Sequence, residues 1–213
     1  MENTNKGYYD IDVDLEAVLT DSGMINELFY LKDLQQRKLF LKTDIDSFSV
    51  ADIVKHIMQF NKEDAGIRAE HRRPILLYLS SHGGCVDAGF ELVDAIQMSE
   101  TPVYTINLGY WYSMGFFIGI AGHKRYATRN ATFLMHDGSS FVIDSGAKVQ
   151  DRMDFQRRLG ERIKEYVLEN SNVTSEEYDS KFRTEWYLFS QEAKEKGFID
   201  FIIGEDCDIN EIV

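Results

Sequence analysis

The chain has 213 residues, of which 44% are hydrophobic and 13% aromatic, and this is enough apolar material for one folded domain. A formal net charge of −13, with no clustered Lys and Arg, argues against nucleic acid as a partner. Two cysteines indicate no disulfide framework, and the absence of a signal-peptide pattern or an apolar run of membrane-spanning length predicts a cytoplasmic protein without membrane contact.

The first 25 residues are polar and acidic. Within them Ile11, Val13 and Leu15 alternate with Asp, which is typical of a short strand. A frayed terminus explains the same pattern equally well. We therefore expect an N-terminal segment over residues 1–25 and a single domain over residues 26–213.

Residues 35–41 predict a short strand that leads into a helix. The helix is expected over residues 50–64, because apolar side chains recur there at helical spacing. Ser49 is its expected N-cap, and Gly66 is its expected stop.

Residues 75–79 form a continuous apolar run of the kind buried on both faces of a parallel sheet. A Gly83–Gly84 pair follows, then a helical pattern and a second strand at residues 103–108. This order predicts a right-handed βαβ unit. The glycine pair fits either a tight turn or a close approach of the backbone to a ligand.

Residues 109–122 are small, apolar and rich in glycine, which predicts a buried helix with Ser113 near its start. A serine there has two interpretations. It is an N-cap for the helix, or it is a nucleophile whose neighbouring N–H groups face a developing oxyanion.

A nucleophile needs a base, and His136 ends the next apolar strand, at residues 131–135. A lone histidine is more often a surface residue or a hydrogen-bonded core residue. At a strand end beside Gly138, however, it occupies a typical place for a site residue. Spacing alone leaves both interpretations open.

Residues 147–170 predict a helix of roughly 36 Å. A helix this long on a small domain serves as a subunit contact or packs on its own domain, and the sequence favours neither. Beyond it, Thr174 opens a capping box and Ser190 is the expected N-cap of a helix at 191–196. A last strand is expected at residues 198–203.

Several short motifs in one order resemble the proteolytic subunit of the ATP-dependent Clp protease family over about residues 39–203. They are Tyr-Ser-Met-Gly at 112–115, Ala-Gly-His-Lys-Arg at 121–125, Asn-Ala at 130–131, Met-His at 135–136, Ser-Ser-His-Gly-Gly at 80–84 and the segment 189–200. The resemblance implies an α/β protein of the Clp protease/crotonase-like fold, built from repeated ββα units. It also implies a projecting handle helix, about residues 138–170, through which two rings join.

Carried over position by position, the resemblance makes Ser113 the nucleophile and His136 the general base. The backbone N–H groups of Gly84 and Met114 become the oxyanion hole. Glu185 stands where the family has the orienting Asp. An extended substrate would pair with the loop after Gly84 and with a strand near Phe141.

The chain departs from the family pattern around this site. Thr184 replaces an Arg, His82 replaces a Pro in the oxyanion loop, and Asp137–Gly138 replaces Gln-Pro. Trp111 and Tyr112 replace two small residues, and they either narrow the substrate pocket or fill the core.

Asp137 and Asp179 are the other candidates for the acid. Asp137 is too close to His136 in sequence, because successive strand side chains point to opposite faces. Asp179 lies in the helix that the capping box opens, and it is expected to face solvent. Glu185 is therefore the preferred acid.

The predicted function is serine-type hydrolysis of unfolded polypeptides inside an oligomeric chamber, without a metal or bound cofactor. The resemblance implies that this chamber consists of stacked seven-membered rings capped by a Clp-type ATPase, and that the N-terminal segment lies at the axial pore and the ATPase contact. One alternative is a weak or inactive ring subunit that assembles with an active paralogue. Another is an acyl-CoA enzyme of the crotonase type, against which the Ser-Met-Gly and Met-His motifs argue.

Overall fold

A computed structural model describes residues 22–138 and 145–212. The strand expected around Ile11 to Leu15, the pore and ATPase contact of the N-terminal segment, and the substrate-pairing strand near Phe141 lie outside these residues.

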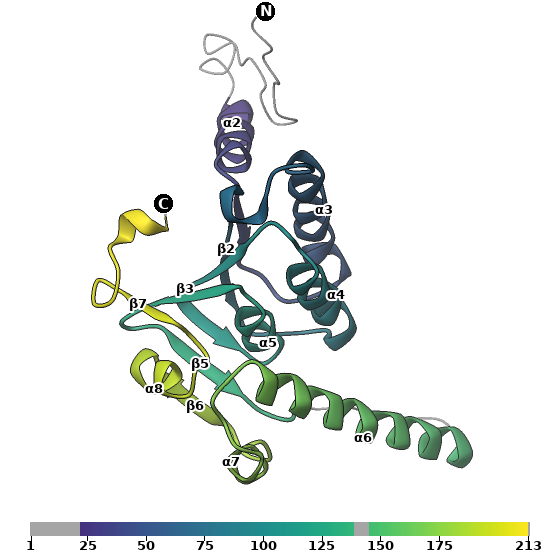
Figure 1. Cartoon of the computed structure of the whole chain (residues 1–213). Coiled ribbons are helices and arrows are strands. Elements are labelled where there is room, and N and C mark those ends of the chain that lie inside the picture. Colours follow the sequence, from purple (N-terminus) through teal and green to yellow (C-terminus); the bar gives the residue numbers. More distant parts are fainter. Residues whose placement is uncertain (1–21, 139–144, 213) are drawn as a thin grey trace, which may run out of the picture.

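The described residues form an α/β fold around one predominantly parallel sheet (Figure 1). Its main path runs β1-β2-β3-β4-β7, and β5 branches from β3 to pair with β6. The β5–β6 pair is antiparallel, and the other pairs are parallel. The strands are β1 (Lys38–Leu41), β2 (Ile75–Ser81), β3 (Val103–Tyr112), β4 (Lys124–Thr128), β5 (Thr132–Met135), β6 (Trp186–Phe189) and β7 (Phe201–Ile203).

Helices pack against this sheet, and their apolar faces supply much of the main core. The α-helices are α2 (Ser22–Gln35), α3 (Ser47–Glu63), α4 (Val86–Gln97), α5 (Met114–Ile120), α6 (Gly146–Glu169), α7 (Ser175–Lys181) and α8 (Ser190–Glu195), with short 3₁₀ turns at Ala69–His71 and Ile209–Glu211. Alternation along β2 divides the apolar side chains between two clusters. Ile75, Leu77 and Leu79 enter the main core, whereas Leu76 and Tyr78 join a smaller cluster that Ile212 closes.

The first helices differ from the sequence-based expectation. Helix α2 was not expected, and α3 begins at Ser47, earlier than residue 50. Asp46, not Ser49, is the N-cap of α3. The Asp46 carboxylate accepts bonds from the Phe48 and Ser49 amides, and the Ser49 hydroxyl accepts the Asp46 amide. The two residues form one capping box, so Ser49 occupies its third helical position.

Strand β3 continues to Tyr112, beyond the expected end at residue 108, and buried helix α5 starts only at Met114. Strand β4 was not expected, because its sequence Lys-Arg-Tyr-Ala-Thr carries charge. It pairs with residues 104–107 of β3, whereas β5 pairs with residues 110–112. The long strand β3 therefore pairs with β4 along its middle part and with β5 at its C-terminal end.

Helix α6 confirms the expected long helix within a residue at each end, and Figure 1 shows it extending away from the body of the molecule. Its C-terminal end is anchored, since Tyr166 and Val167 are buried and the Tyr166 hydroxyl donates to the Phe117 carbonyl at 2.8 Å. Its N-terminal half is exposed and carries the apolar side chains of Met153 and Phe155. The helix thus packs on its own domain at one end and projects at the other.

The C-terminal region also shifts one assignment. Thr174 is the N-cap of α7, accepting the Glu177 amide at 3.2 Å, but the expected capping box is not completed, because the Glu177 carboxylate pairs with Lys196 at 2.6 Å. Ser190, however, is the first residue of α8 and not its N-cap, and its hydroxyl donates to the Thr128 carbonyl at 2.7 Å. The expected strand at 198–203 is shortened to β7. Among the described helices, none combines the length and the apolar composition that crossing a membrane requires.

Candidate active site

Ser113 stands at the sharp turn between β3 and α5, in a conformation that few side chains adopt. Its φ is 53° and its ψ is −123°. Positive φ is costly for a residue with a Cβ, and such strain concentrates at functional sites. The Ser113 hydroxyl makes no cap bond to α5. The N-cap interpretation of this serine is therefore incomplete, because the hydroxyl is free of the bond that defines a side-chain cap.

The Gly83–Gly84 turn packs directly against Ser113. Their φ values of 107° and 146° lie where only glycine is comfortable. A Cβ on Gly83 would lie 2.6 Å from the Ser113 Cβ and 3.0 Å from both the Ser113 Oγ and the Met114 amide nitrogen. The turn and the start of α5 are thus close enough to enclose one small group between them.

Ile45 holds the glycine turn from its buried side. The Ile45 amide donates to the Gly83 carbonyl at 2.8 Å, and the Cys85 amide donates to the Ile45 carbonyl at 2.7 Å. A side chain on Gly84 would collide with that carbonyl. The Gly84 amide lies between these two bonds and takes part in neither, while the Met114 amide belongs to the first turn of α5, which lacks intrahelical acceptors. Both amides are suitably placed donors for an anionic oxygen.

His136 follows β5, the strand that links the Ser113 turn to β6. The Ser113 amide donates to the Leu134 carbonyl at 2.9 Å, two residues before the histidine. Strand β5 pairs antiparallel with β6, and the last pair is Met135 with Trp186. Continued by one step, that register would place His136 opposite Glu185 at the edge of the sheet.

The three side chains do not bond to one another: among the described residues, no hydrogen bond joins Ser113, His136 and Glu185. Glu185 is exposed, and it lies on the same face as the exposed Tyr187. Partial desolvation, followed by the nearby Glu185 carboxylate, raises the pKa of the Tyr187 hydroxyl above its ordinary value. The structure therefore gathers the three backbones at one edge without closing a triad.

The two rival acids lie in different surroundings. Asp179 is exposed and its carboxylate binds the Lys164 ammonium at 2.7 Å, which ties it to α6. Asp137 is exposed next to His136, and its charge is among the causes that raise the pKa of buried Tyr178, after burial itself and Asp179. Neither carboxylate forms a hydrogen bond with His136.

The bulky residues before Ser113 separate onto two faces of β3. Trp111 is fully buried, its indole N–H donates to the Leu79 carbonyl at 3.0 Å, and it fills the core beneath Gly119 of α5. Tyr112 lies on the opposite face, where it meets the ring of Tyr187 with 6.0 Å between centroids. Trp111 is thus a core residue, and Tyr112 belongs to the surface beside the site.

An aromatic surface on that face was not predicted from the sequence. It is formed by His82, Tyr110, Tyr112 and Tyr187. Its ring contacts run from His82 to Tyr110 and Tyr112, and from Tyr112 to Tyr187. The alternation of Tyr110 and Tyr112 within an extended run is the signal that would have revealed it.

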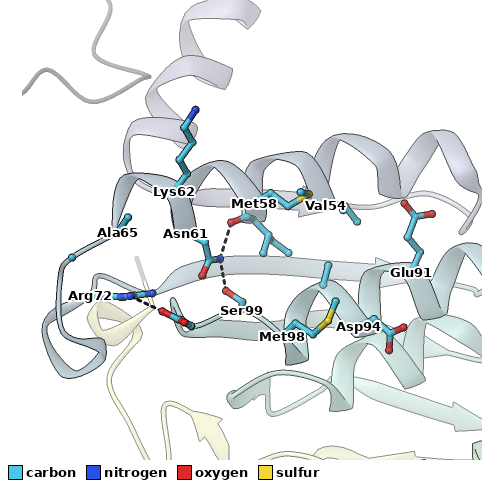
Figure 2. A pocket seen from close by; sticks show the side chains of 14 residues that line it. Val54, Met58, Asn61, Lys62, Ala65, Arg72, Glu91, Asp94, Met98 and Ser99 are labelled. Atoms are coloured by element: carbon cyan, nitrogen blue, oxygen red, sulfur yellow. Dashed lines mark hydrogen bonds and ion pairs between the residues drawn. The ribbon is translucent and has the colours of Figure 1, made fainter.

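A groove with a volume of about 870 Å³ lies elsewhere, between α3 and α4 (Figure 2). Exposed Met58 and Met98 flank it, and Asn61 donates to the Ser99 hydroxyl at 2.7 Å. At one end Arg72 pairs with Glu100 at 2.8 Å. None of the candidate site residues lines this groove. Within the described ranges, no cluster of three or more His, Cys, Asp or Glu side chains is arranged to hold a metal ion.

Comparison with known proteins gives consistent matches. The model of the Clp protease family matches residues 23–206. ATP-dependent Clp protease proteolytic subunit 3 of Streptomyces coelicolor is 31% identical over 183 residues, covering 83% of this chain and 79% of the relative. Subunit 2 of Rhodococcus jostii is 28% identical, covering 84% and 90%, and subunit 2 of Treponema pallidum is 26% identical, covering 89% and 92%.

Proposed function

This chain belongs to the Clp protease family, and from that membership we propose that it is a proteolytic subunit that hydrolyses peptide bonds with Ser113 as its nucleophile. The observation that carries the assignment is the Ser113 turn. A strained serine with an uncapped hydroxyl faces a two-glycine turn, and two backbone amides border the same small space. Acyl transfer needs this combination of a nucleophile and oxyanion donors.

In the proposed reaction, the Ser113 Oγ attacks the carbonyl carbon of the scissile peptide bond while His136 takes its proton. The amides of Gly84 and Met114 bind the oxyanion of the tetrahedral intermediate. His136 then returns the proton to the leaving amine, which leaves an acyl group on Ser113. A water molecule, deprotonated by His136, attacks the acyl carbon, and His136 returns the proton to the Ser113 Oγ as the acyl–oxygen bond breaks and the acid leaves.

Glu185 is the proposed acid that orients His136. The β5–β6 register supports this role, since its last pair, Met135 with Trp186, is formed by the residues next to His136 and Glu185. The exposure of Glu185 indicates that its carboxylate must turn from the Tyr187 side toward the imidazole. We propose that this adjustment accompanies assembly or substrate binding, and that activity is lower where it fails.

The proposed assembly is a chamber of stacked seven-membered rings in the cytoplasm, fed with unfolded polypeptides by a Clp-type ATPase. The projecting half of α6, with Met153 and Phe155 exposed, supports its role as the handle between rings. The relatives are named as proteolytic subunits of an ATP-dependent protease, which supports the ATPase partner.

The test is covalent labelling with a fluorophosphonate, read by intact mass, for the chain alone and with its ATPase. We expect one adduct on the wild type and none on Ser113→Ala. Ser190→Ala is the matched control, because Ser190 also begins a helix after a strand but follows an ordinary backbone turn. An unlabelled wild type under both conditions would replace this proposal with the inactive ring subunit.

A further inference from the structure

His82 lies between Ser81, the last residue of β2, and the Gly83–Gly84 turn. Ser81 points to the buried side, where its hydroxyl accepts the Gly83 amide at 3.1 Å, and His82 points to the exposed aromatic surface. The Ser81 and Ile45 contacts hold the turn from the buried side. What holds it from the other side is the His82 ring.

The His82 imidazole lies flat on the Tyr110 ring. The two centroids are 4.4 Å apart with an interplanar angle of 28°, and the Tyr112 ring is 5.6 Å away. Offset stacking at these separations adds a specific attraction to the burial of area. The imidazole therefore has a defined resting place although it is exposed.

The rings beneath His82 are themselves fixed to the sheet. The hydroxyls of Tyr112 and Thr132 share a hydrogen bond of 2.9 Å, and the Tyr112 ring packs edge-on against Tyr187 of β6. Tyr110 lies 5.4 Å from Tyr112 on the same strand face. A stack on this base ties the chain before Gly83 to β3, β5 and β6 at once.

The turn needs such a tie because two successive glycines follow. Glycine has the greatest backbone freedom of any residue, and the Gly84 amide is useful only if it stays aimed at the space beside Ser113. Oxyanion donors act by being fixed in place before the charge develops. A small loosening at residue 82 would be transmitted directly to residue 84.

We propose that His82 is a positioning residue, which stacks on Tyr110 and so holds the Gly83–Gly84 turn in its place beside Ser113. The proposal rests on the proposed function, since the turn is taken to carry the oxyanion donor. His82 acts through the stacking of its ring, so a phenyl ring should substitute for the imidazole.

The kinetic test uses His82→Ala, His82→Phe, Tyr110→Ala and the Ala–Ala double variant on a short peptide, with oligomer size checked for each. We expect His82→Ala to lower kcat about three- to tenfold, as the strength of an aromatic pair implies, with little change in KM. His82→Phe should retain most of the wild-type rate. The double variant should be no slower than the slower single variant, because both changes remove one contact.

A matched control comes from His56, which also contacts two rings, those of Tyr30 and Phe60, but far along the chain on α3. His56→Ala should leave kcat unchanged. If His82→Phe is as slow as His82→Ala, or if the two single losses multiply in the double variant, the stack does not position the turn.

Hydrogen exchange of the peptide covering residues 79–85 tests the stack without any catalysis. The amides of Gly83 and Cys85, which donate to the Ser81 hydroxyl and to the Ile45 carbonyl, should exchange about three- to tenfold faster in His82→Ala and at the wild-type rate in His82→Phe. Unchanged exchange in His82→Ala overturns the inference. An unlabelled wild type would overturn the proposed function alone, and the exchange experiment would still decide whether the stack holds the turn.

Discussion

At the scale of single residues, substitutions of Glu185 give the most direct test of the proposed site. Replacing it with Gln removes the charge that would hold the His136 tautomer, and the loss in turnover should approach about 10⁴-fold, as in the serine-protease triad. Glu185→Asp restores the acid usual in the family and should retain or raise activity. The measurement is the rate of peptide hydrolysis by both variants and the wild type, compared at equal oligomer size. Equal rates for wild type and Glu185→Gln would leave a Ser–His dyad.

A second residue-scale prediction concerns the nearly buried ion pair of Asp64 and Arg37, whose closest atoms are 2.6 Å apart. Burial alone would raise the pKa of Asp64, but hydrogen bonds from Arg37 and Thr101 outweigh it and hold the pKa below its ordinary value. Asp64→Asn should lower the free energy of unfolding by about 3 kcal/mol at neutral pH, because it removes the carboxylate nearest to Arg37 and leaves that cation with the more distant Glu63, at 4.0 Å.

The pH dependence of this effect has a definite sign. A depressed folded-state pKa stabilises the protein above the ordinary carboxyl value of about 4 and stops doing so as pH falls through the lower folded value. The difference between wild type and Asp64→Asn in urea unfolding should therefore be constant from about pH 5 upward and shrink below about pH 4. Asp52→Asn is the control, since its pair with Lys55 is exposed and should change stability by less than about 1 kcal/mol. A difference that grows toward acid pH would contradict the assignment.

The positions of the candidate site residues at strand ends and turns could be predicted from the sequence, and the orientations of their side chains could not. Ser113, His136 and the glycine pair stand out because strand ends and glycine turns have local signatures. The direction of the Glu185 carboxylate depends on a rotamer beside Tyr187. The place of His82 depends on rings that belong to another strand, so no local pattern reports it.

At the scale of elements, helix α5 crosses β3 so closely that it depends on one glycine. A Cβ on Gly119 would lie well inside the contact distance of the Trp111 indole, whereas a Cβ on Gly160 of α6 would meet nothing within 4 Å. We expect Gly119→Ala to cost about 1–3 kcal/mol by overpacking, and Gly160→Ala to gain about 0.5–1 kcal/mol through helix propensity. Chemical denaturation of the two variants compares the same substitution in both places. Similar shifts for both would show that α5 has room to move.

Strand β4, which was not predicted from the sequence, depends on partners that are distant along the chain. Strand β4 pairs on both sides, with β3 and β7, yet its first two residues are charged. Arg125 compensates by binding Asp200 at 2.7 Å and the Asn170 carbonyl at 2.7 Å. Long-range partners of this kind override local polarity. The helices at α3, α4 and α6 were predictable because their apolar spacing is set within the element itself.

At the scale of the whole molecule, the projecting half of α6 predicts association. Met153 and Phe155 are 58% and 51% exposed on a helix half that leaves the body of the fold. Met153→Glu combined with Phe155→Glu should reduce the mass of the assembly to about half, if the handles join two rings. Gln156→Glu, which adds charge at a neighbouring exposed position, should leave the mass unchanged. Light scattering at micromolar concentration decides, and a monomeric wild type would contradict the ring assembly itself.

The path of the chain through the sheet also sets when a new molecule can begin to cut. Strand β6 lies beyond α6 and α7, and β7 closes the sheet on β4 from near the C-terminal end of the described chain. Ribosomes therefore deliver the proposed nucleophile and base well before the acid and before the strands that hold their support in place. Since long-range pairings form late, a growing chain carries Ser113 without a finished site at least until residues 185–203 have been made. The order of synthesis thus delays the proposed activity and protects neighbouring nascent chains during that interval.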